Sequence, residues 1–536
     1  KWPNFVRNPW PNFIGIFNEH YDKGIIVSGN LIDYNSYKKM PIILKTDING
    51  NVLWEKRIRR MIDFYYNYTY LIDSYVTNDG GLIVTGATNS QDECLGDNCL
   101  DAFVMKLNAC GEKDWCKIYS VPMDVEEGVS VLQLPNNNYL VQVNYFGYDD
   151  ANKRIWLFCL DPNGETIWQK VYCQEPTNFY GESGWNTYLV NDDKILITGD
   201  CWVSDPLVPQ NWYIVPLFIK TNANGELIYS KEWTTDPNHF SGDISRSCED
   251  YKGNYWTATK AYIADTLPFN CGPGALVHTH KDGNAIKYLT YTQNLVPNEG
   301  AGRVTTVVEL DTNLLLVTNG WGNYVPFNTV YHVNTYLSDT NGVILAEKEL
   351  LLNESGITKS IVTSDHKVLM TAGHYFPQTK WDMYLYKLLP NLDYDTLDTR
   401  LLTYDSLCPH AIVSDTIPLD CDIVVGIDEA FSNPARSSLQ AYPNPSSGAV
   451  TLVLPECYLS QSSVGTLSVQ TANYVWPNGK QIELTNLQGN TLKAMPWPDG
   501  QNAQTINLAG LAPGTYIARI TNQDRALCQC TVMVVK

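Results

Sequence analysis

The sequence predicts an all-β protein built largely from repeats, and two recurring motifs carry this prediction. The first is a hairpin signature, Lys45 to Trp54 (KTDINGNVLW), in which Asp and Gly bound a four-residue turn between apolar runs. This pattern is typical of a type I turn between antiparallel strands. Variants of it contain Gly111, Gly164, Gly225, Gly283 and Gly342, at spacings of 53 to 61 residues. A period in that range indicates a repeat architecture.

The second motif is a short aliphatic and β-branched run that precedes each hairpin. Seven such runs begin at Gly24, Gly81, Tyr139, Ile195, Tyr255, Leu314 and Val368. With one more strand before each run, the repeating unit is a four-stranded meander of about 55 residues. Four short strands cannot bury both faces alone, so the units are expected to stack radially. We therefore predict a seven-bladed β-propeller of four-stranded blades over residues 1–404, in which the seventh hairpin, near Asp393, lacks the turn glycine.

Length and composition limit the classes of protein. The 536 residues exceed one ordinary domain, and a propeller followed by one small domain fits that length. The net charge of −20 argues against nucleic acid or an anionic membrane surface as a partner. No apolar run reaches about 18 residues, so we expect no membrane span. The chain begins at Lys1 without Met, and we interpret it as a mature protein whose export signal has been removed.

The 14 cysteines favour an oxidising compartment. Close pairs are spaced for local disulfides: Cys94 with Cys99, Cys110 with Cys116, Cys248 with Cys271, and Cys408 with Cys421. Zinc is the alternative, but no Cys-x-x-Cys motif occurs, so we expect disulfides of open connectivity. The acidic loop 91–101 and the histidines His278 and His280 lack a convincing ligand spacing. We therefore expect no metal site and no cofactor.

Residues 438–536 form a second region, with alternating strands and Pro or Gly at the turns, enough for a sandwich of about seven strands. Its motifs are Tyr442 to Pro445 (YPNP), Leu487 to Gly489 (LQG) and Leu511 to Tyr516 (LAPGTY). In this order they resemble the type A C-terminal sorting domain of the bacterial type IX (Por) secretion system. The resemblance implies an immunoglobulin-like sandwich that the translocon and its shuttle proteins recognise. It also implies delivery to the outer surface of a Gram-negative bacterium or to the medium.

Residues 405–437 are predicted to connect the two regions. Short Asp-Ser/Thr-aliphatic tripeptides resemble the O-glycosylation acceptor of bacteria with this secretion system, with acceptors at Thr266, Thr396, Ser406 and Thr416. The last three crowd the connector, where we expect glycans to stiffen it.

Aromatic residues are frequent in the predicted loops between the second and third strands of the blades, which emerge on one face. They are Tyr34, Tyr37, Tyr145, Tyr148, Trp202, Trp212, Tyr262, Phe269, Trp321, Tyr324, Tyr375 and Trp381. Aromatic rings among Asn, Asp and Gly suit a sugar or peptide surface, and the alternative is that they pack within the loops.

No catalytic motif is present: neither Gly-x-Ser-x-Gly, His-Glu-x-x-His, a phosphate loop nor a Rossmann fingerprint occurs. We therefore predict a secreted or surface-displayed, non-enzymatic protein that binds glycan or protein through this face. One alternative is a structural subunit of a surface layer or filament that self-associates through the C-terminal domain. The other is a hydrolase or lyase with clustered carboxylates of raised pKa in the central funnel.

Overall fold

The structure is a computed structural model, and the chain divides after Gly426 into two compact units. The described residues are 4–6, 14–33, 38–59, 69–89, 100–120, 125–146, 154–172, 179–191, 193–204, 212–233, 239–242, 246–263, 274–291, 300–323, 330–350, 354–376, 380–425, 440–453, 480–486, 491–498, 503–522 and 525–535. Every regular element among them is a β-strand, as predicted.

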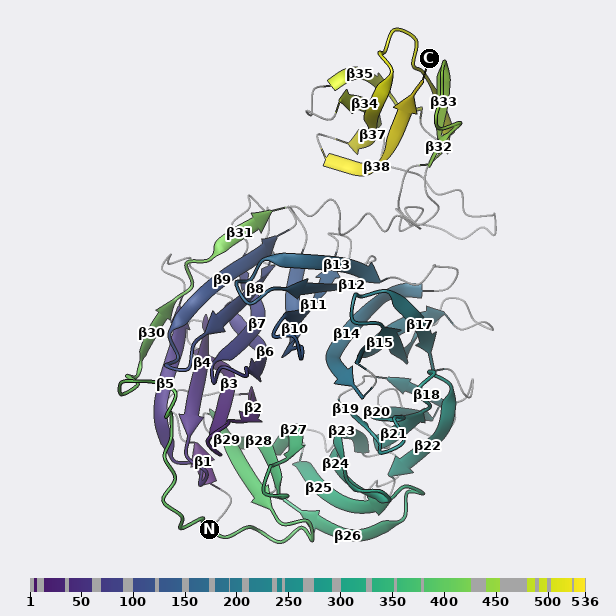
Figure 1. Cartoon of the computed structure of the whole chain (residues 1–536). Coiled ribbons are helices and arrows are strands. Elements are labelled where there is room, and N and C mark those ends of the chain that lie inside the picture. Colours follow the sequence, from purple (N-terminus) through teal and green to yellow (C-terminus); the bar gives the residue numbers. More distant parts are fainter. Residues whose placement is uncertain are drawn as a thin grey trace. The chain divides into compact units, whose positions relative to one another are not determined.

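In the described part of the first unit, seven sheets form a ring of blades (Figure 1), and the strands of blades one to six follow one another from inside to outside. Blades one to three contain β2 (Ile14–Glu19), β3 (Ile25–Asp33), β4 (Lys38–Thr46) and β5 (Val52–Arg59); β6 (Tyr70–Val76), β7 (Leu82–Asn89), β8 (Leu100–Leu107) and β9 (Lys113–Ser120); and β10 (Val125–Gln133), β11 (Tyr139–Phe146), β12 (Arg154–Leu160) and β13 (Thr166–Tyr172). Blades four and five contain β14 (Phe179–Val190), β15 (Lys194–Ser204), β16 (Trp212–Thr221) and β17 (Leu227–Glu232); and an inner strand in two pieces, β18 (His239–Gly242) and β19 (Ser247–Glu249), with β20 (Tyr255–Ile263), β21 (Gly274–Thr279) and β22 (Ala285–Tyr291). Blade six contains β23 (Gly300–Asp311), β24 (Leu314–Asn323), β25 (Val330–Asp339) and β26 (Ile344–Glu349). This arrangement confirms the predicted β-propeller.

The N-terminal strand closes the ring. Blade seven contains β27 (Glu354–Val362), β28 (Val368–Phe376) and β29 (Lys380–Leu388), and its outermost strand is β1 (Asn4–Val6). The pairing of β1 with β29 is antiparallel, with Phe5 opposite Tyr384. The first described strand of the chain therefore completes the last blade through backbone hydrogen bonds.

The turn glycines of the repeat lie against side chains of the preceding blade. Gly164 has a φ of 81°, and a Cβ added to it would lie 2.9 Å from ring atoms of Trp115. A Cβ on Gly225 would lie 2.6 Å from the Trp168 ring. Glycine is thus required twice, by the left-handed backbone and by the packed ring. This contact between neighbouring blades explains why the Gly and the Trp recur together.

In the seventh hairpin, a large residue stands at the turn position and a small one at the facing position of the preceding blade. Leu392, at a φ of 69°, stands at the turn and is buried. In blade six, Ala346 lies opposite Leu337, at the register position that Trp54 occupies opposite Lys45 in blade one. Ala346 packs against the core cluster that contains Leu392. A small residue on one blade and a large one on the next keep the interface filled.

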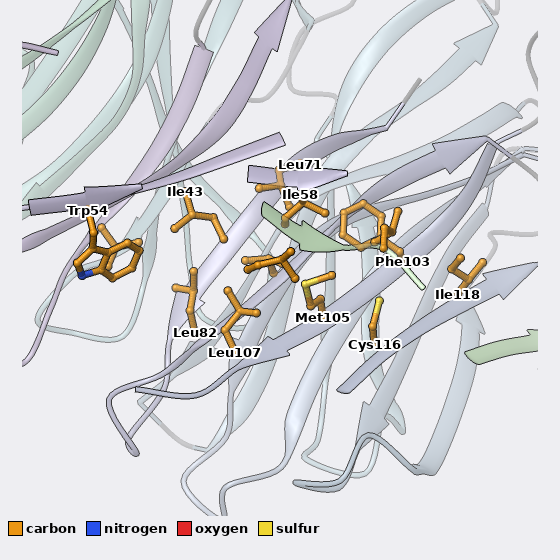
Figure 2. Packing of buried hydrophobic residues seen from close by; sticks show 14 residues of the cluster. Ile43, Trp54, Ile58, Leu71, Leu82, Phe103, Met105, Leu107, Cys116 and Ile118 are labelled. Atoms are coloured by element: carbon orange, nitrogen blue, oxygen red, sulfur yellow. The ribbon is translucent and has the colours of Figure 1, made fainter. Parts of the chain in front are cut away.

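Residues 405–425, predicted as a connector, pack against the first unit. They contribute β30 (Asp415–Pro418), parallel to β5, and β31 (Asp422–Val425), parallel to β9. Ile417 and Leu419 join the core between blades one and two, in which Ile43 and Trp54 face Leu82 and Leu107 (Figure 2). We call residues 405–425 the strap. The first unit therefore extends past the predicted boundary at residue 404.

The second unit, described by itself, is a sandwich of two sheets. One sheet contains β32 (Gln440–Tyr442), β33 (Ala449–Val453) and β36 (Ala503–Asn507); the other contains β34 (Lys480–Asn486), β35 (Thr491–Pro496), β37 (Gly514–Asn522) and β38 (Arg525–Val534). Val450 and Ile506 of the first sheet share a core with Ile482 and Val532 of the second.

Candidate functional site

The tight turns of the blades, between first and second and between third and fourth strands, lie at the same strand ends, which we call the turn side. Buried lysines recur at the turn side, and their role is structural. Lys45, Lys106 and Lys387 occupy the same position near the end of the third strand, and each is at most 4% exposed. The Lys106 ammonium lies 2.8 Å from Asp79 in the first hairpin of its own blade. A buried ammonium is tolerated only where it is paired and hydrogen-bonded. The repeated lysine and the hairpin aspartate therefore hold the two hairpins of a blade together.

A group of metal-ligand type surrounds Lys45. His20, Asp22 and Asp405 bring ligand atoms close together, but the Lys45 ammonium contacts all three residues, at 2.8 Å from Asp22 and 3.2 Å from Asp405. Burial raises the pKa of Asp22, yet hydrogen bonds from His20, the Asp405 amide and Lys45 outweigh it and hold the pKa well below its usual range. The positive charge that these groups require is supplied by the lysine.

The histidines considered as metal ligands have other contacts. His278 stacks on Trp256 with ring centroids 3.9 Å apart, and its Nε2 lies 3.0 Å from Asp250. Burial lowers the pKa of His278 despite this carboxylate. His280 lies beyond the end of β21, 3.0 Å from Asp282. The structure therefore does not bring the two rings to a shared site.

The disulfides differ from the predicted local pairs. Cys110 is bonded to Cys408 and Cys116 to Cys421, so the pairings Cys110–Cys116 and Cys408–Cys421 are wrong. Both bonds join the strap to blade two, because the strap runs beside that blade. Two cysteines on the blade therefore each meet one on the strap.

The remaining cysteine predictions fall on Cys94, Cys99, Cys248 and Cys271. Cys248 is a free thiol whose pKa burial raises to about 12, so it does not form the predicted bond. Cys94, Cys99 and Cys271 lie outside the described residues.

Three predicted glycosylation acceptors, Thr396, Ser406 and Thr416, are exposed on the propeller unit. The aspartate before each acceptor forms an ion pair with a blade lysine: Asp395 with Lys367 at 2.6 Å, Asp405 with Lys45 at 3.2 Å, and Asp415 with Lys56 at 2.8 Å. These aspartates therefore have a structural role whether or not the hydroxyls are modified. Thr266 lies outside the described residues.

The aromatic residues predicted to bind ligand are only partly described. Tyr145 is buried in β11, opposite Glu126, and Trp202 near the end of β15 is 38% exposed. Tyr34, Tyr37, Tyr148, Phe269 and Tyr324 lie outside the described residues, as do the side chains of Trp212, Tyr262, Trp321, Tyr375 and Trp381. Of the two described side chains, Trp202 is the one available to a ligand.

A cavity of about 360 Å³ lies among the innermost strands, and we call it the central channel. Residues of β2, β6, β10, β14, β19, β23 and β27 line it, so every blade contributes. Among them, Asp73 of β6 accepts hydrogen bonds through Oδ2 from Ser130 Oγ at 3.1 Å and Val131 N at 2.9 Å. Lys359 of β27 donates to Asn18 Oδ1 at 2.9 Å.

Two cations face this polar channel. Arg246 precedes β19 and donates to Asn186 Oδ1. Burial and repulsion from Arg246 lower the pKa of Lys359 to about 8, although Asp73 acts in the opposite sense. Sequence reasoning missed these residues because they lie in separate blades. The one sequence signal is the presence of polar residues in strands that are otherwise apolar.

The C-terminal motifs stabilise the sandwich that contains them. Asn444 Oδ1 accepts a hydrogen bond from Met533 N at 2.7 Å, which ties the first motif to β38. Tyr516 OH donates to Ala512 O at 2.6 Å within the third motif. These contacts give residues of the first and third motifs a structural role in the sandwich.

A family model described as a secretion system C-terminal sorting domain matches residues 440–534. The chain therefore carries the type IX sorting tail, which implies contact with that secretion machinery and export to the cell surface or the extracellular space. No helix in the described part of the chain is long and apolar enough to cross a membrane. No curated protein sequence matches the chain.

Several solved structures are similar to it. They include a protein of unknown function from Dyadobacter fermentans (10% identity, TM-score 0.41, 59% of this chain and 93% of that one) and the polysaccharide lyase Uly1 (9%, 0.42, 73% and 92%). The β-propeller domain of the trilobed protease from Pyrococcus furiosus is a third (10%, 0.37, 73% and 100%). At such identities and TM-scores, these likenesses assign no activity to this chain.

Proposed function

We propose that this type IX cargo works at the surface of a Gram-negative bacterium or in its medium, as a non-enzymatic propeller that binds glycan or protein. The observation that carries the proposal is the contrast between the two sides of the blades. On the turn side, short hairpins use their polar side chains for internal ion pairs and hydrogen bonds. The loops between second and third strands leave the opposite strand ends, and Trp202 stands exposed at one of them.

The carboxylates support binding rather than hydrolysis. In the described part of the chain, burial raises the pKa of Glu232 and of Glu309, which lie on different blades, β17 and β23. The central channel contains Asp73, whose Oδ2 is occupied by two donors. Hydrolysis by paired carboxylates requires one carboxyl of raised pKa close to an ionised one. Asp250 acts on Glu309 in this sense, but its oxygens are held by Asn254 N and His278 in the hairpin between β19 and β20, and neither carboxylate lines the central channel.

A glycan array with the full-length protein tests this function, because the array presents many candidate sugars at once. For each glycan bound, Trp202→Ala is expected to weaken binding about tenfold, as a stacked aromatic contact would. Tyr251→Ala is the matched control, since Tyr251 is an exposed aromatic residue in a hairpin on the turn side. Equal loss of binding in both variants, or binding unaffected by Trp202→Ala, would contradict the proposal that glycans bind at the loops between second and third strands, which we call the loop face.

Glycosylation of the strap and of the segment before it is part of the same proposal. Glycans on Thr396, Ser406 and Thr416 would extend from exposed hydroxyls without displacing the paired aspartates. Intact mass and peptide mapping of protein from the cell surface and the medium test this modification. Unmodified Ser406 and Thr416 in both fractions would refute it.

A lyase is the second candidate, and Lys359 is the observation that favours it. A lysine whose pKa lies near 8 can act as a base close to neutral pH, and the neighbouring Arg246 could neutralise a substrate carboxylate. The neutral lysine would remove the proton next to the carboxylate, and the electrons of that C–H bond would form a C=C double bond as the glycosidic C–O bond breaks. The leaving oxygen would take a proton from the lysine ammonium or from water. Absorbance of the unsaturated product, measured with polyuronates, distinguishes this activity from binding alone.

A further inference from the structure

The central channel contains two cationic side chains, Lys359 and Arg246, that are not part of the proposed binding surface at the loops between second and third strands. Lys359 is half-buried, and its described hydrogen bond uses one of three ammonium protons. Arg246 is also half-buried and donates through one nitrogen to Asn186. Neither cation forms an ion pair with a carboxylate in the described part of the chain. Within the described part of the cavity lining, several strong donors therefore remain available.

The channel has an excess of positive charge. Asp73 faces the same space and partly offsets Lys359, but its Oδ2 is already occupied by Ser130 and Val131. Among the described lining residues, two cations and one carboxylate leave a net charge of about +1. Opposite charges attract each other more strongly beside the protein than in bulk water. A single negative charge would balance this excess.

The remaining lining suits a polyhydroxylated molecule. Asn18, Gln133, Thr187, Ser247 and Thr306 line the cavity with amides and hydroxyls. Asn18 is already used by Ser74 and Lys359. The side chains of Gln133, Thr187 and Ser247 each form one internal hydrogen bond and keep further donor or acceptor capacity. The volume of about 360 Å³ falls in the range of small-molecule sites, about 300–1,000 Å³. A flat guanidinium matches a carboxylate through paired hydrogen bonds.

We propose that the central channel binds a small sugar that carries one carboxylate, with that carboxylate between Arg246 and Lys359 and its hydroxyl groups on the polar lining. This site is separate from the loop face, the loops that join the second and third strands, because its residues lie on the innermost strands or, for Arg246, directly before one. Loss of Trp202-dependent binding and loss of channel binding are therefore separate results.

Isothermal titration calorimetry of the full-length protein with D-glucuronate tests the proposal, with D-glucose as the neutral control of the same size. Binding of glucuronate with no detectable binding of glucose is expected. Lys359→Met and Arg246→Gln should each weaken binding at least about tenfold, the size expected for a lost hydrogen bond to a charged group. Lys359→Arg, which keeps the charge, should bind within a few-fold of wild type.

Lys231→Met serves as the matched control, because Lys231 lies on the outermost strand β17, far from the channel lining in its own blade. Urea midpoints of all variants show whether each is folded. Equal binding of glucose, equal binding of sulfate, or a loss in Lys231→Met as large as in Lys359→Met would overturn the proposal. Failure of a correctly folded Lys359→Met to weaken binding would overturn it as well.

Discussion

The substitution Gly164→Ala tests whether the repeated turn glycine is a packing requirement between blades. The backbone of Gly164 has a φ of 81°, where an L-residue costs about 1–2 kcal/mol. The new Cβ would also lie 2.9 Å from two atoms of the Trp115 ring. This ring cannot easily retreat, because its Nε1 donates to Pro162 O at 2.9 Å in the same turn.

The two costs differ in origin and can be separated. Overpacking of a close contact costs about 1–3 kcal/mol, so the total loss of unfolding free energy should be about 2–5 kcal/mol. Gly253→Ala is the matched control, because Gly253 has a φ of 79° but its nearest contact is Glu249 Oε1 at 3.4 Å. It should lose only the backbone part, about 1–2 kcal/mol.

Urea denaturation of the full-length chain, followed by circular dichroism, measures these losses. In a Trp115→Ala background the ring is gone, so Gly164→Ala should cost no more than Gly253→Ala does in the wild-type chain. A double-mutant cycle isolates this steric coupling. If Gly164→Ala and Gly253→Ala are equally destabilising, or if the cost persists without Trp115, the packing explanation is refuted.

Three further perturbations test other parts of the structure. Cys408→Ser should lower the unfolding free energy by about 2–4 kcal/mol, and non-reducing peptide maps should link Cys110 to Cys408 in the wild type; a link from Cys110 to another cysteine would contradict the strap. Lys45→Met leaves Asp22 buried without its cation and should cost about 3–5 kcal/mol at neutral pH. The pKa of Asp22 is held below 3.8 in the folded wild type, so the wild type loses stability as the pH falls below 3.8. The difference in unfolding free energy between wild type and Lys45→Met should therefore become smaller there. The pKa of Lys359 is about 8 in the folded state and 10.5 ordinarily, so between these values the unfolded state binds more protons. The free energy of unfolding of the wild type should therefore rise as the pH increases from about 8 to 10.5, and it should rise less in Lys359→Met.

The local sequence determined the repeat, the turns and the C-terminal sorting domain. A turn glycine, an apolar run and a fixed period are properties of neighbouring residues, so blade content and the order of strands within a blade could be predicted. The motifs of residues 438–536 were equally local, and the family match at residues 440–534 confirms them. Even the missing glycine of the seventh hairpin was visible, although its compensation by Ala346 was not.

Only the tertiary structure decided which distant segments meet. Ring closure brings β1 beside β29, and the strap places Cys408 beside Cys110 across 298 residues. Cysteines close in sequence were predicted to pair, because their spacing carries no information about the strap, which returns to pair with the outer strands β5 and β9 of blades one and two. The central channel is the same kind of feature: Asp73, Arg246 and Lys359 stand in separate repeats and become neighbours because the innermost strands of all blades converge on one axis.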